Sequence, residues 1–145
     1  MRLLIALSMF VFLISCATTS KETVGVGEVN SSIAEIKKIA NKVIGGIRTQ
    51  SENGREIDSN YFSLYEDEDF DAETADERAY TKVYILGDRR PYKVRVSVYI
   101  ERKKSTGFVF AGHDKGLAVT KAKELKARLT EGLGKRNMID DFRAF

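Results

Sequence analysis

YTKVYILGDRRPYKVRVSVYIER, residues Tyr80–Arg102, is the stretch that decides the fold. From residue 92 to residue 101, apolar side chains alternate with mostly polar ones, which is the period of a strand with one buried face. Residues 81–85 show the same alternation, and GDRRP at 87–91 has the composition of a turn. The stretch therefore predicts an antiparallel hairpin with one buried and one solvated face.

Two further stretches are expected to pair with this hairpin. Residues 103–107, KKSTG, indicate a second turn, and we expect a strand at Phe108–His113 with Phe108 and Phe110 on the buried face. Upstream, Asn60–Glu66 also alternates apolar and polar side chains. Together these stretches predict an antiparallel meander of three or four strands.

Two amphipathic helices are expected on either side of the meander. The first begins after Ser32, which matches a capping box, and its apolar stripe reaches Ile47, with an earlier end at Gly45-Gly46 as the alternative. The second extends from about Lys115 to Glu131, and glycines at 132 and 134 are expected to end it. The predicted fold is a two-layer α+β domain of order α-β-β-β-β-α, with both helices packed on one face of the sheet.

Composition limits the class of protein. The chain has 145 residues, a formal net charge of +3 and one cysteine. Its length indicates a single domain, and the nearly balanced charge gives no indication of a nucleic-acid partner. One cysteine excludes a disulfide within the chain, so Cys16 needs another explanation.

The first seventeen residues have the layout of a secretory signal peptide. Arg2 precedes the uncharged, mostly apolar run Leu3–Ile14, and small residues follow it. The run is shorter than the roughly 20 residues that a membrane-spanning helix needs, which argues against an uncleaved anchor. Within this segment, Leu13-Ile14-Ser15-Cys16 resembles the lipobox of bacterial lipoproteins, which ends in an obligatory cysteine.

The resemblance implies cleavage between Ser15 and Cys16 and attachment of a diacylglyceryl group to the Cys16 thiol. Ala17 after the cysteine resembles lipoproteins that are sent on to the outer membrane. The expected location is therefore the bacterial outer membrane, with the domain in the periplasm; the inner membrane and the cell surface are alternatives. The expected organisation is a cleaved signal peptide at 1–15, the lipidated cysteine and a flexible tether at 16–29, and one domain at 30–145.

The tether prediction rests on composition alone. Residues 17–28, ATTSKETVGVGE, are rich in Thr, Gly and Ser and have no sustained periodicity. A short strand through Val24 and Val26 is the alternative interpretation.

A basic segment surrounds the second strand of the hairpin. Seven cations lie within residues 89–104: Arg89, Arg90, Lys93, Arg95, Arg102, Lys103 and Lys104. If they share one surface, they would attract an anionic lipid, a glycan or an acidic protein. The alternative is that positive charge keeps an exposed strand soluble.

An acidic segment at 66–77 precedes the hairpin. Asp67, Asp69 and Asp71 have the one-three-five spacing of a calcium loop. The match fails at the sixth position, Ala72, and at the twelfth, Arg78, where a glycine and a glutamate are required. A solvated loop is the preferred interpretation, and a docking surface for a basic partner is the alternative.

Candidate catalytic residues are few. His113 is followed by Asp114, but adjacent side chains of a strand point to opposite faces. The sequence has no recognisable nucleophile motif, glycine-rich phosphate loop or His/Cys cluster. We therefore expect no catalytic residues, no metal and no cofactor apart from the covalent lipid, and a protein that is not an enzyme.

Two hypotheses of function follow. The first is a membrane-anchored envelope lipoprotein, a non-catalytic accessory module that binds an envelope protein on the periplasmic side. The element order is similar in outline to that of small outer-membrane lipoproteins that assist envelope assembly, although no residue motif supports that similarity. The second is a binder of anionic lipid or glycan through the basic segment, whose affinity would fall steeply with ionic strength.

Overall fold

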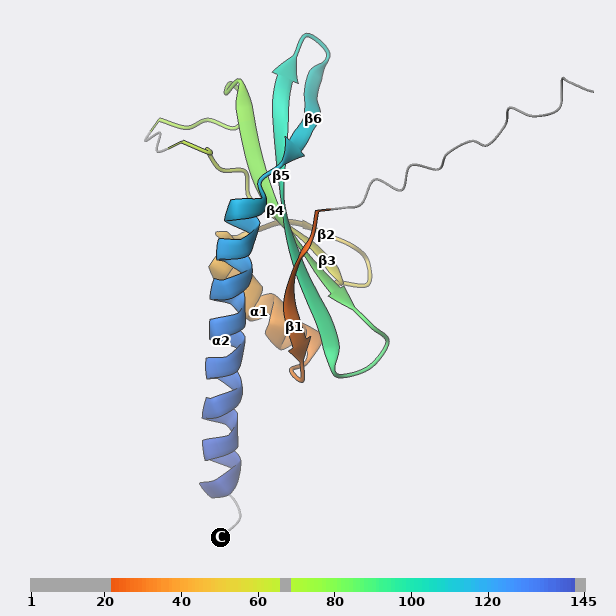
Figure 1. Ribbon diagram of the computed structural model, residues 1–145, viewed down its shortest axis with the longest axis vertical. Coiled ribbons are helices and arrows are strands. Elements are labelled where there is room, and N and C mark those ends of the chain that lie inside the picture. Colours follow the sequence, from red (N-terminus) through yellow and green to blue (C-terminus); the bar gives the residue numbers. More distant parts are fainter. Residues whose placement is uncertain (1–21, 66–68, 143–145) are drawn as a thin grey trace, which may run out of the picture.

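The computed structural model of the chain describes residues 22–65 and 69–142, with side chains up to Gly132. Six strands and two helices follow one another in the order β-α-β-β-β-β-β-α (Figure 1). They are β1 (Val24–Val29), α1 (Ile33–Ile44), β2 (Ile47–Gln50), β3 (Glu56–Ser59), β4 (Glu77–Leu86), β5 (Tyr92–Lys104), β6 (Gly107–His113) and α2 (Lys115–Phe142).

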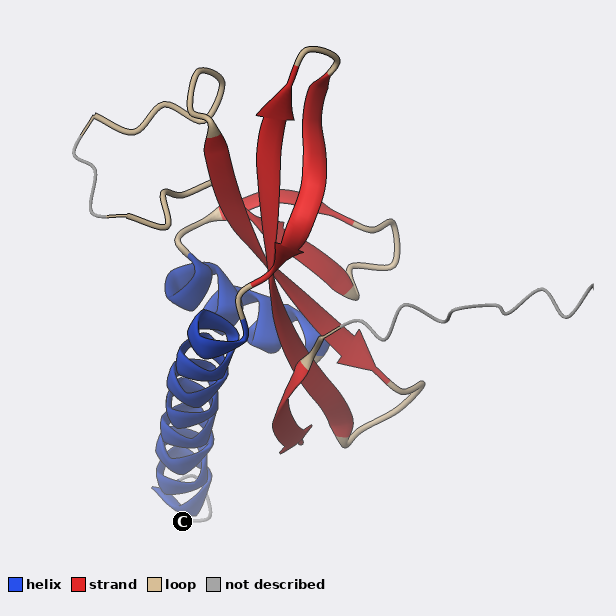
Figure 2. Ribbon diagram, turned by 45° about the horizontal axis from the view of Figure 1, so that its top comes forward, coloured by secondary structure: helices blue, strands red, loops and turns tan. Residues whose placement is uncertain are grey.

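All six strands belong to one antiparallel sheet of order β1-β5-β4-β3-β2, with β6 also paired to β5. β4 pairs with β5 along its length, so β1 and β6 share the opposite edge of β5. There, β1 lies beside Tyr92–Val96 and β6 beside Tyr99–Lys104. Ser97 and Val98 lie in the gap between these two neighbours. The β5–β6 hairpin projects beyond the helices, as both views show (Figures 1 and 2).

One main core cluster joins both helices to the sheet. It contains buried residues of α1 and α2 together with buried residues of β1, β3, β4 and β5. Ile36, Ile57, Val83, Val96 and Leu125 have no exposed surface. Complete burial of an aliphatic side chain stabilises a fold by about 1.5–3 kcal/mol. A second, smaller cluster contains Ala79, Val98 and Ala118.

Side-chain caps start both helices. Ser32 Oγ accepts a hydrogen bond of 3.2 Å from the Glu35 amide, as the capping-box pattern predicts. The Asp114 carboxylate accepts one of 2.8 Å from the Leu117 amide at the start of α2. These bonds satisfy amides that have no partner within a helix.

The predicted α+β class is confirmed, and so is the hairpin at its centre. β4 and β5 pair from Glu77 opposite Arg102 to Leu86 opposite Lys93. The predicted strand number is wrong, because the sheet has six strands and not three or four. Two of the unpredicted strands, β2 and β3, lie from the predicted end of the first helix to the strand predicted at Asn60–Glu66.

The strand predicted at Asn60–Glu66 is wrong. Its described part makes only an isolated bridge, between Phe62 and Ala79. The strand in this region is β3, which looks polar because one of its two buried side chains is Ser59. Ser59 Oγ accepts a hydrogen bond of 2.8 Å from the Thr81 amide, so a buried serine takes the place of an apolar residue.

The tether prediction is corrected for residues 24–29, which form β1. Val26 and Val29 are both buried, although they are three residues apart. The register shifts between Gly25 and Gly27, and Gly27 has a φ of 126°. This bulge adds a residue to the alternation, which hides the strand from a search for a period of two.

The helix ends also differ from the main prediction. α1 ends at Ile44, before Ile47, because Gly45 takes a left-handed conformation with a φ of 81°, so the earlier end at Gly45-Gly46 is the correct alternative. α2 continues through Gly132 to Phe142, beyond the predicted stop near Glu131. A glycine costs a helix about 1 kcal/mol but does not end it. A Cβ on Gly132 would lie 3.4 Å from Ile39 Cδ1, so the glycine accommodates the packing of α2 against α1.

Candidate functional site

The strand side chains that alternate with the core residues form a second surface of the sheet, which we call the outer face. Opposite residues in the β4–β5 and β5–β6 ladders share this face. It comprises Arg78, Tyr80, Lys82 and Tyr84 of β4, Lys93, Arg95, Ser97, Tyr99, Glu101 and Lys103 of β5, and Phe108, Phe110 and His113 of β6.

Four rings form an aromatic cluster on the outer face: Tyr80, Tyr99, Phe110 and His113. Tyr80 and Tyr99 stack with ring centroids 5.1 Å apart and an interplanar angle of 8°. The Tyr99 ring centroid lies 4.6 Å from that of His113 and 6.0 Å from that of Phe110. β4, β5 and β6 thus each contribute to one continuous aromatic surface.

The aromatic cluster is open to solvent at β6. Phe110 is 55% exposed, which makes it one of three large exposed apolar side chains among the described residues. His113 Nε2 is buried and has no hydrogen-bond partner within the described part of the chain. The cluster therefore presents an apolar ring to solvent beside a histidine whose polar atom is not satisfied.

Burial raises the pKa of two tyrosines on this face. The pKa of Tyr80 rises to about 12, first through burial and then through the carboxylates of Asp58 and Glu101. The pKa of Tyr84 also rises, through burial and the 2.6 Å hydrogen bond between its hydroxyl and that of Tyr99. Both shifts favour the protonated hydroxyl and extend its range to more alkaline pH.

Two cations of β4 form ion pairs with three carboxylates near the outer face. Arg78 Nε lies 2.8 Å from Glu101 Oε2. Lys82 Nζ lies 3.3 Å from Asp58 Oδ1 and 3.6 Å from Glu56 Oε2. By contrast, no ion-pair partner within the described residues lies beside the exposed Arg95.

The seven predicted basic residues are not brought together. Arg89 and Arg90 lie in the β4–β5 turn, and Lys93, Arg95 and Lys103 lie along the outer face. Arg102 and Lys104 alternate with these and lie on the opposite face, where Arg102 Nη2 is 2.5 Å from Glu77 Oε1. From Lys93 to Lys103 the strand covers about 33 Å at its usual rise. A single small anion therefore cannot contact all seven.

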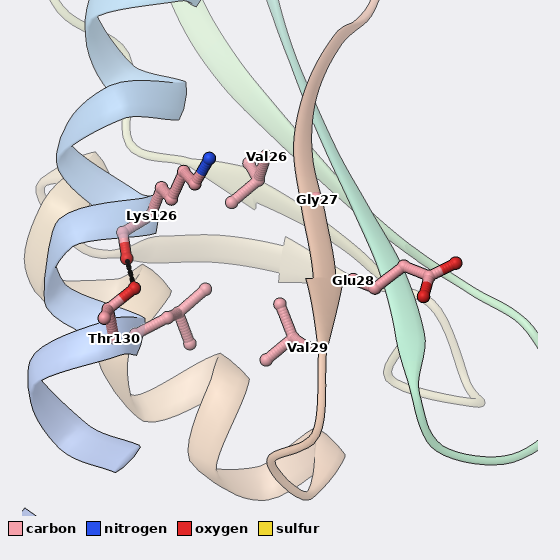
Figure 3. Close-up of a pocket in the computed structure, with 7 residues that line it drawn as sticks. Val26, Gly27, Glu28, Val29, Lys126 and Thr130 are labelled. Atoms are coloured by element: carbon pink, nitrogen blue, oxygen red, sulfur yellow. Dashed lines mark hydrogen bonds between the residues drawn. The ribbon is translucent and has the colours of Figure 1, made fainter. Parts of the chain in front are cut away.

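A groove between β1 and α2 is a second candidate surface (Figure 3). Val26 and Val29 point from β1 towards α2, and Leu129 closes the apolar floor. Lys126 and Thr130 line the groove on the α2 side, and its volume is about 220 Å³. Because β1 is the last strand of the described sheet, its outward backbone groups have no strand partner there.

The described part of the acidic segment, residues 69–76, forms turns, and Asp67 lies outside the described residues. The Asp71 carboxylate accepts hydrogen bonds from the Glu73 amide at 3.1 Å and the Thr74 hydroxyl at 2.8 Å. These bonds lower the pKa of Asp71. Across residues 22–65 and 69–142, no three His, Cys, Asp or Glu side chains are grouped as metal ligands.

The predicted lipidation and cleavage residues, Cys16 and Ser15, lie outside the described residues. The chain is described from Glu22, whose carbonyl accepts a hydrogen bond of 2.9 Å from Ser97 Oγ. Ser97 lies in the gap between β1 and β6, so the chain enters the sheet there, next to the aromatic cluster. Among the described helices, none has the length and apolar character needed to cross a membrane.

Sequence reasoning missed the aromatic cluster. It placed Phe110 on the buried face, but the two-residue turn at 105–106 pairs Gly107 with Lys104 and so places Phe110 opposite Glu101. The signal for the Tyr80–Tyr99 pair was present, because centring the hairpin on Arg89–Arg90 gives that register directly.

Comparison with known proteins gives no family for this chain. No family model, no curated protein and no solved structure matches it.

Proposed function

We propose that this chain is an envelope lipoprotein, anchored through lipid on Cys16, whose domain is a non-catalytic accessory module for an envelope protein in the periplasm. The proposed location is the outer membrane, and the signal peptide at 1–15 is removed. The proposal takes the domain as two layers, with both helices over the core face of the sheet, because residues of both helices share one core cluster with β4 and β5.

The observation that carries this proposal is the short distance in sequence between Cys16 and the fold. The chain joins the sheet at Glu22, six residues after Cys16. Six fully extended residues span about 20 Å. Two or three acyl chains on Cys16 would hold a protein on a membrane firmly, and this connector would keep the domain beside it.

The open edge of β1 supports the binding part of the proposal. Unpaired backbone groups at the edge of a sheet accept an extended segment of another chain as an additional strand. The groove beside this edge offers an apolar floor at Val26, Val29 and Leu129, with Lys126 at its side. The partner that fits is an envelope protein with an extended, apolar segment that carries an acidic residue.

The anchor is tested by intact mass and membrane fractionation of the native protein beside Cys16→Ala. We expect the native protein to lack residues 1–15, to carry acyl chains and to sediment with membranes. The variant should be unprocessed at this site and carry no lipid. A native mass without acyl chains would refute the lipoprotein assignment.

The binding surface is tested by photo-crosslinking in cells. A photoreactive residue at Thr130, in the groove, should give a discrete crosslinked product. The same residue at Glu124, which is exposed and outside the groove lining, should not. Equal products from both positions, or none from Thr130, would contradict the groove as the partner site.

A second candidate function is binding of an anionic lipid or glycan through the basic segment. Arg95 supports it, because it is exposed and has no ion-pair partner in the part of the chain that the structure describes, and Lys93 lies two residues away on the same face. Replacing both with alanine should abolish charge-dependent binding and leave unfolding unchanged. Binding to an anionic ligand that persists in this variant, or that does not respond to salt, would exclude this site.

A further inference from the structure

We infer that the outer face around Phe110 is apposed to the headgroup region of the membrane that holds the anchor. The inference rests on the proposed lipid anchor and adds an orientation: the outer face is towards the membrane, and the groove and α2 are away from it. The lipid surface of the same membrane is the proposed occupant of the exposed aromatic cluster.

The entry point of the chain supports this orientation. Ser97 belongs to the outer face, and its hydroxyl holds the Glu22 carbonyl at 2.9 Å. The connector to Cys16 therefore leaves the sheet from the gap between β1 and β6. Tyr99 is the next residue of β5 on the same face, so the aromatic cluster lies at the base of the connector.

The composition of this surface suits a membrane interface. Phe110 is 55% exposed and packs on His113, with ring centroids 5.0 Å apart. Aromatic side chains are favoured at the headgroup level of a bilayer. The ring contacts Tyr99 edge to face, with centroids 6.0 Å apart, and remains exposed at the surface.

The charges on the outer face favour an anionic surface. Arg95 and Lys103 lie on either side of the aromatic cluster along β5, and both are exposed. Lys103 Nζ also donates hydrogen bonds to the Glu73 and Thr74 carbonyls, so Arg95 is the main cation of this surface. Each cation near an anionic membrane strengthens binding about fivefold. The nearest carboxylate in β5, Glu101, is already paired with Arg78. Glu28 lies opposite Lys93 across the β1–β5 ladder and offsets its charge. Of the two cations Lys93 and Arg95, Arg95 therefore attracts an anionic membrane more strongly.

One exposed phenylalanine and two cations bind a free protein to vesicles only weakly. The anchor changes this, because a short connector makes docking intramolecular and gives it a high effective concentration. The same patch that is insufficient in solution is therefore sufficient next to an acylated Cys16.

The test uses a single tryptophan as a probe of depth. The chain contains none, so Phe110→Trp introduces the only one. The full-length acylated protein is reconstituted into vesicles of phosphatidylethanolamine and phosphatidylglycerol, with or without a lipid that carries a shallow nitroxide quencher. We expect blue-shifted emission and quenching at position 110. A Glu124→Trp control on the exposed side of α2 should stay solvent-like and unquenched.

A charge variant tests the electrostatic step. Adding Arg95→Ala to the Phe110→Trp protein should lower the equilibrium constant for docking of the outer face on the membrane about fivefold. This corresponds to the loss of one cation near the surface. Urea unfolding of each variant controls for the fold. If Phe110→Trp destabilises the protein, Ala111→Trp at the adjacent bulge probes the same surface.

The outcomes separate the two proposals. Acylated Phe110→Trp protein in vesicles whose tryptophan emission is solvent-like and unquenched overturns the orientation and leaves the anchor intact. Blue-shifted emission without quenching means that protein rather than lipid covers the surface around residue 110. This result also overturns the inference. Protein that carries no acyl chain and does not enter vesicles overturns the anchor and the orientation together.

Discussion

Arg78 links the connection before β4 to the sheet through four groups. Its guanidinium carbon lies 3.7 Å from the ring centroid of Tyr61 and 3.6 Å from that of Phe108. Its nitrogens bond Glu101 at 2.8 Å, the Ala72 carbonyl at 3.1 Å and the Tyr61 hydroxyl at 3.0 Å. The planar fork of arginine makes these contacts possible at the same time.

Arg78→Ala should therefore lower the free energy of unfolding by about 2–4 kcal/mol, because it leaves the partly buried Glu101 unpaired. Arg78→Lys should recover only part of this loss. The measurement is urea unfolding. The matched control is Arg102→Ala, whose side chain is 61% exposed and pairs with Glu77. Arg102→Ala should lower the free energy of unfolding by no more than about 1 kcal/mol. Equal decreases in the free energy of unfolding for Arg78→Ala and Arg102→Ala would contradict the role given to Arg78.

Tyr80 should make stability depend on pH in the alkaline range. Its pKa is about 12 in the folded chain, against an ordinary value of 10.0. The folded state therefore holds the proton more tightly than the unfolded state, and this contribution is complete below about pH 10. It is lost as the pH rises from about 10 through about 12. Tyr84, whose pKa is also raised, acts in the same direction.

The measurement is the urea midpoint of the native protein and of Tyr80→Phe across this range. The variant should lose less stability between about pH 10 and about pH 12, because it has no phenol to ionise. Parallel curves for both proteins would show that Tyr80 titrates alike in the folded and unfolded states.

The outer face shows for which single residues the face of the sheet can be predicted from the sequence. The alternation of β5 predicted which face Lys93 and Arg95 occupy, and their position opposite the core residues agrees with that prediction. Phe110 could not be placed by alternation alone, because its face depends on the length of the turn at 105–106, from which the register runs unbroken to Phe110 opposite Glu101. A shift of one residue in that turn would place the ring on the other face.

At the scale of elements, the Gly45-Gly46 pair ends α1 and starts the path into β2. Gly45 has a φ of 81° and Gly46 a φ of 104°. A Cβ on Gly45 would meet nothing within 4 Å, whereas one on Gly46 would collide with the Asn60 amide. Asn60 Nδ2 donates a hydrogen bond of 3.1 Å to the Gly45 carbonyl, so it cannot move without losing that bond.

Gly45→Ala should lower the free energy of unfolding by about 1–2 kcal/mol, because alanine is strained in a left-handed conformation. Gly46→Ala should cost about 1 kcal/mol more, because the collision also breaks the Asn60 hydrogen bond. Thermal or urea unfolding of the two variants measures the difference. If Gly46→Ala lowers the free energy of unfolding less than Gly45→Ala does, the contact with Asn60 does not add to the cost of the substitution.

Elements with regular periodicity were predicted and irregular ones were not. The β4–β5 hairpin and the starts of both helices follow from alternation and capping, which are local signals. β1 was predicted only as the alternative to a tether, because its bulge interrupts the alternation. β2 and β3 were missed because tertiary pairing stabilises them in spite of polar side chains. The end of α2 was missed because packing against α1 outweighs the cost of Gly132.

At the scale of the whole molecule, the class of fold followed from the sequence, but the juxtaposition of the chain entry with the aromatic cluster did not. Glu22 and Ser97 are far apart in the chain, and only the sheet order brings them into contact. No local pattern encodes a contact of this kind. The proposed orientation on the membrane depends on this contact, and so does the last prediction.

Lengthening the connector should release the domain from the membrane without removing the anchor. Ten Gly/Ser residues inserted between Ser20 and Lys21 extend the six-residue connector to sixteen. Effective concentration falls roughly as the −3/2 power of connector length, so docking should weaken about fourfold. In vesicles, quenching of the Phe110→Trp probe should fall, while sedimentation with the vesicles stays complete. The same ten residues appended after Phe145 leave the connector unchanged and should have no effect. Quenching that survives the long connector would mean that the outer face binds lipid strongly by itself; quenching that falls equally in both proteins would mean that the connector does not position the domain.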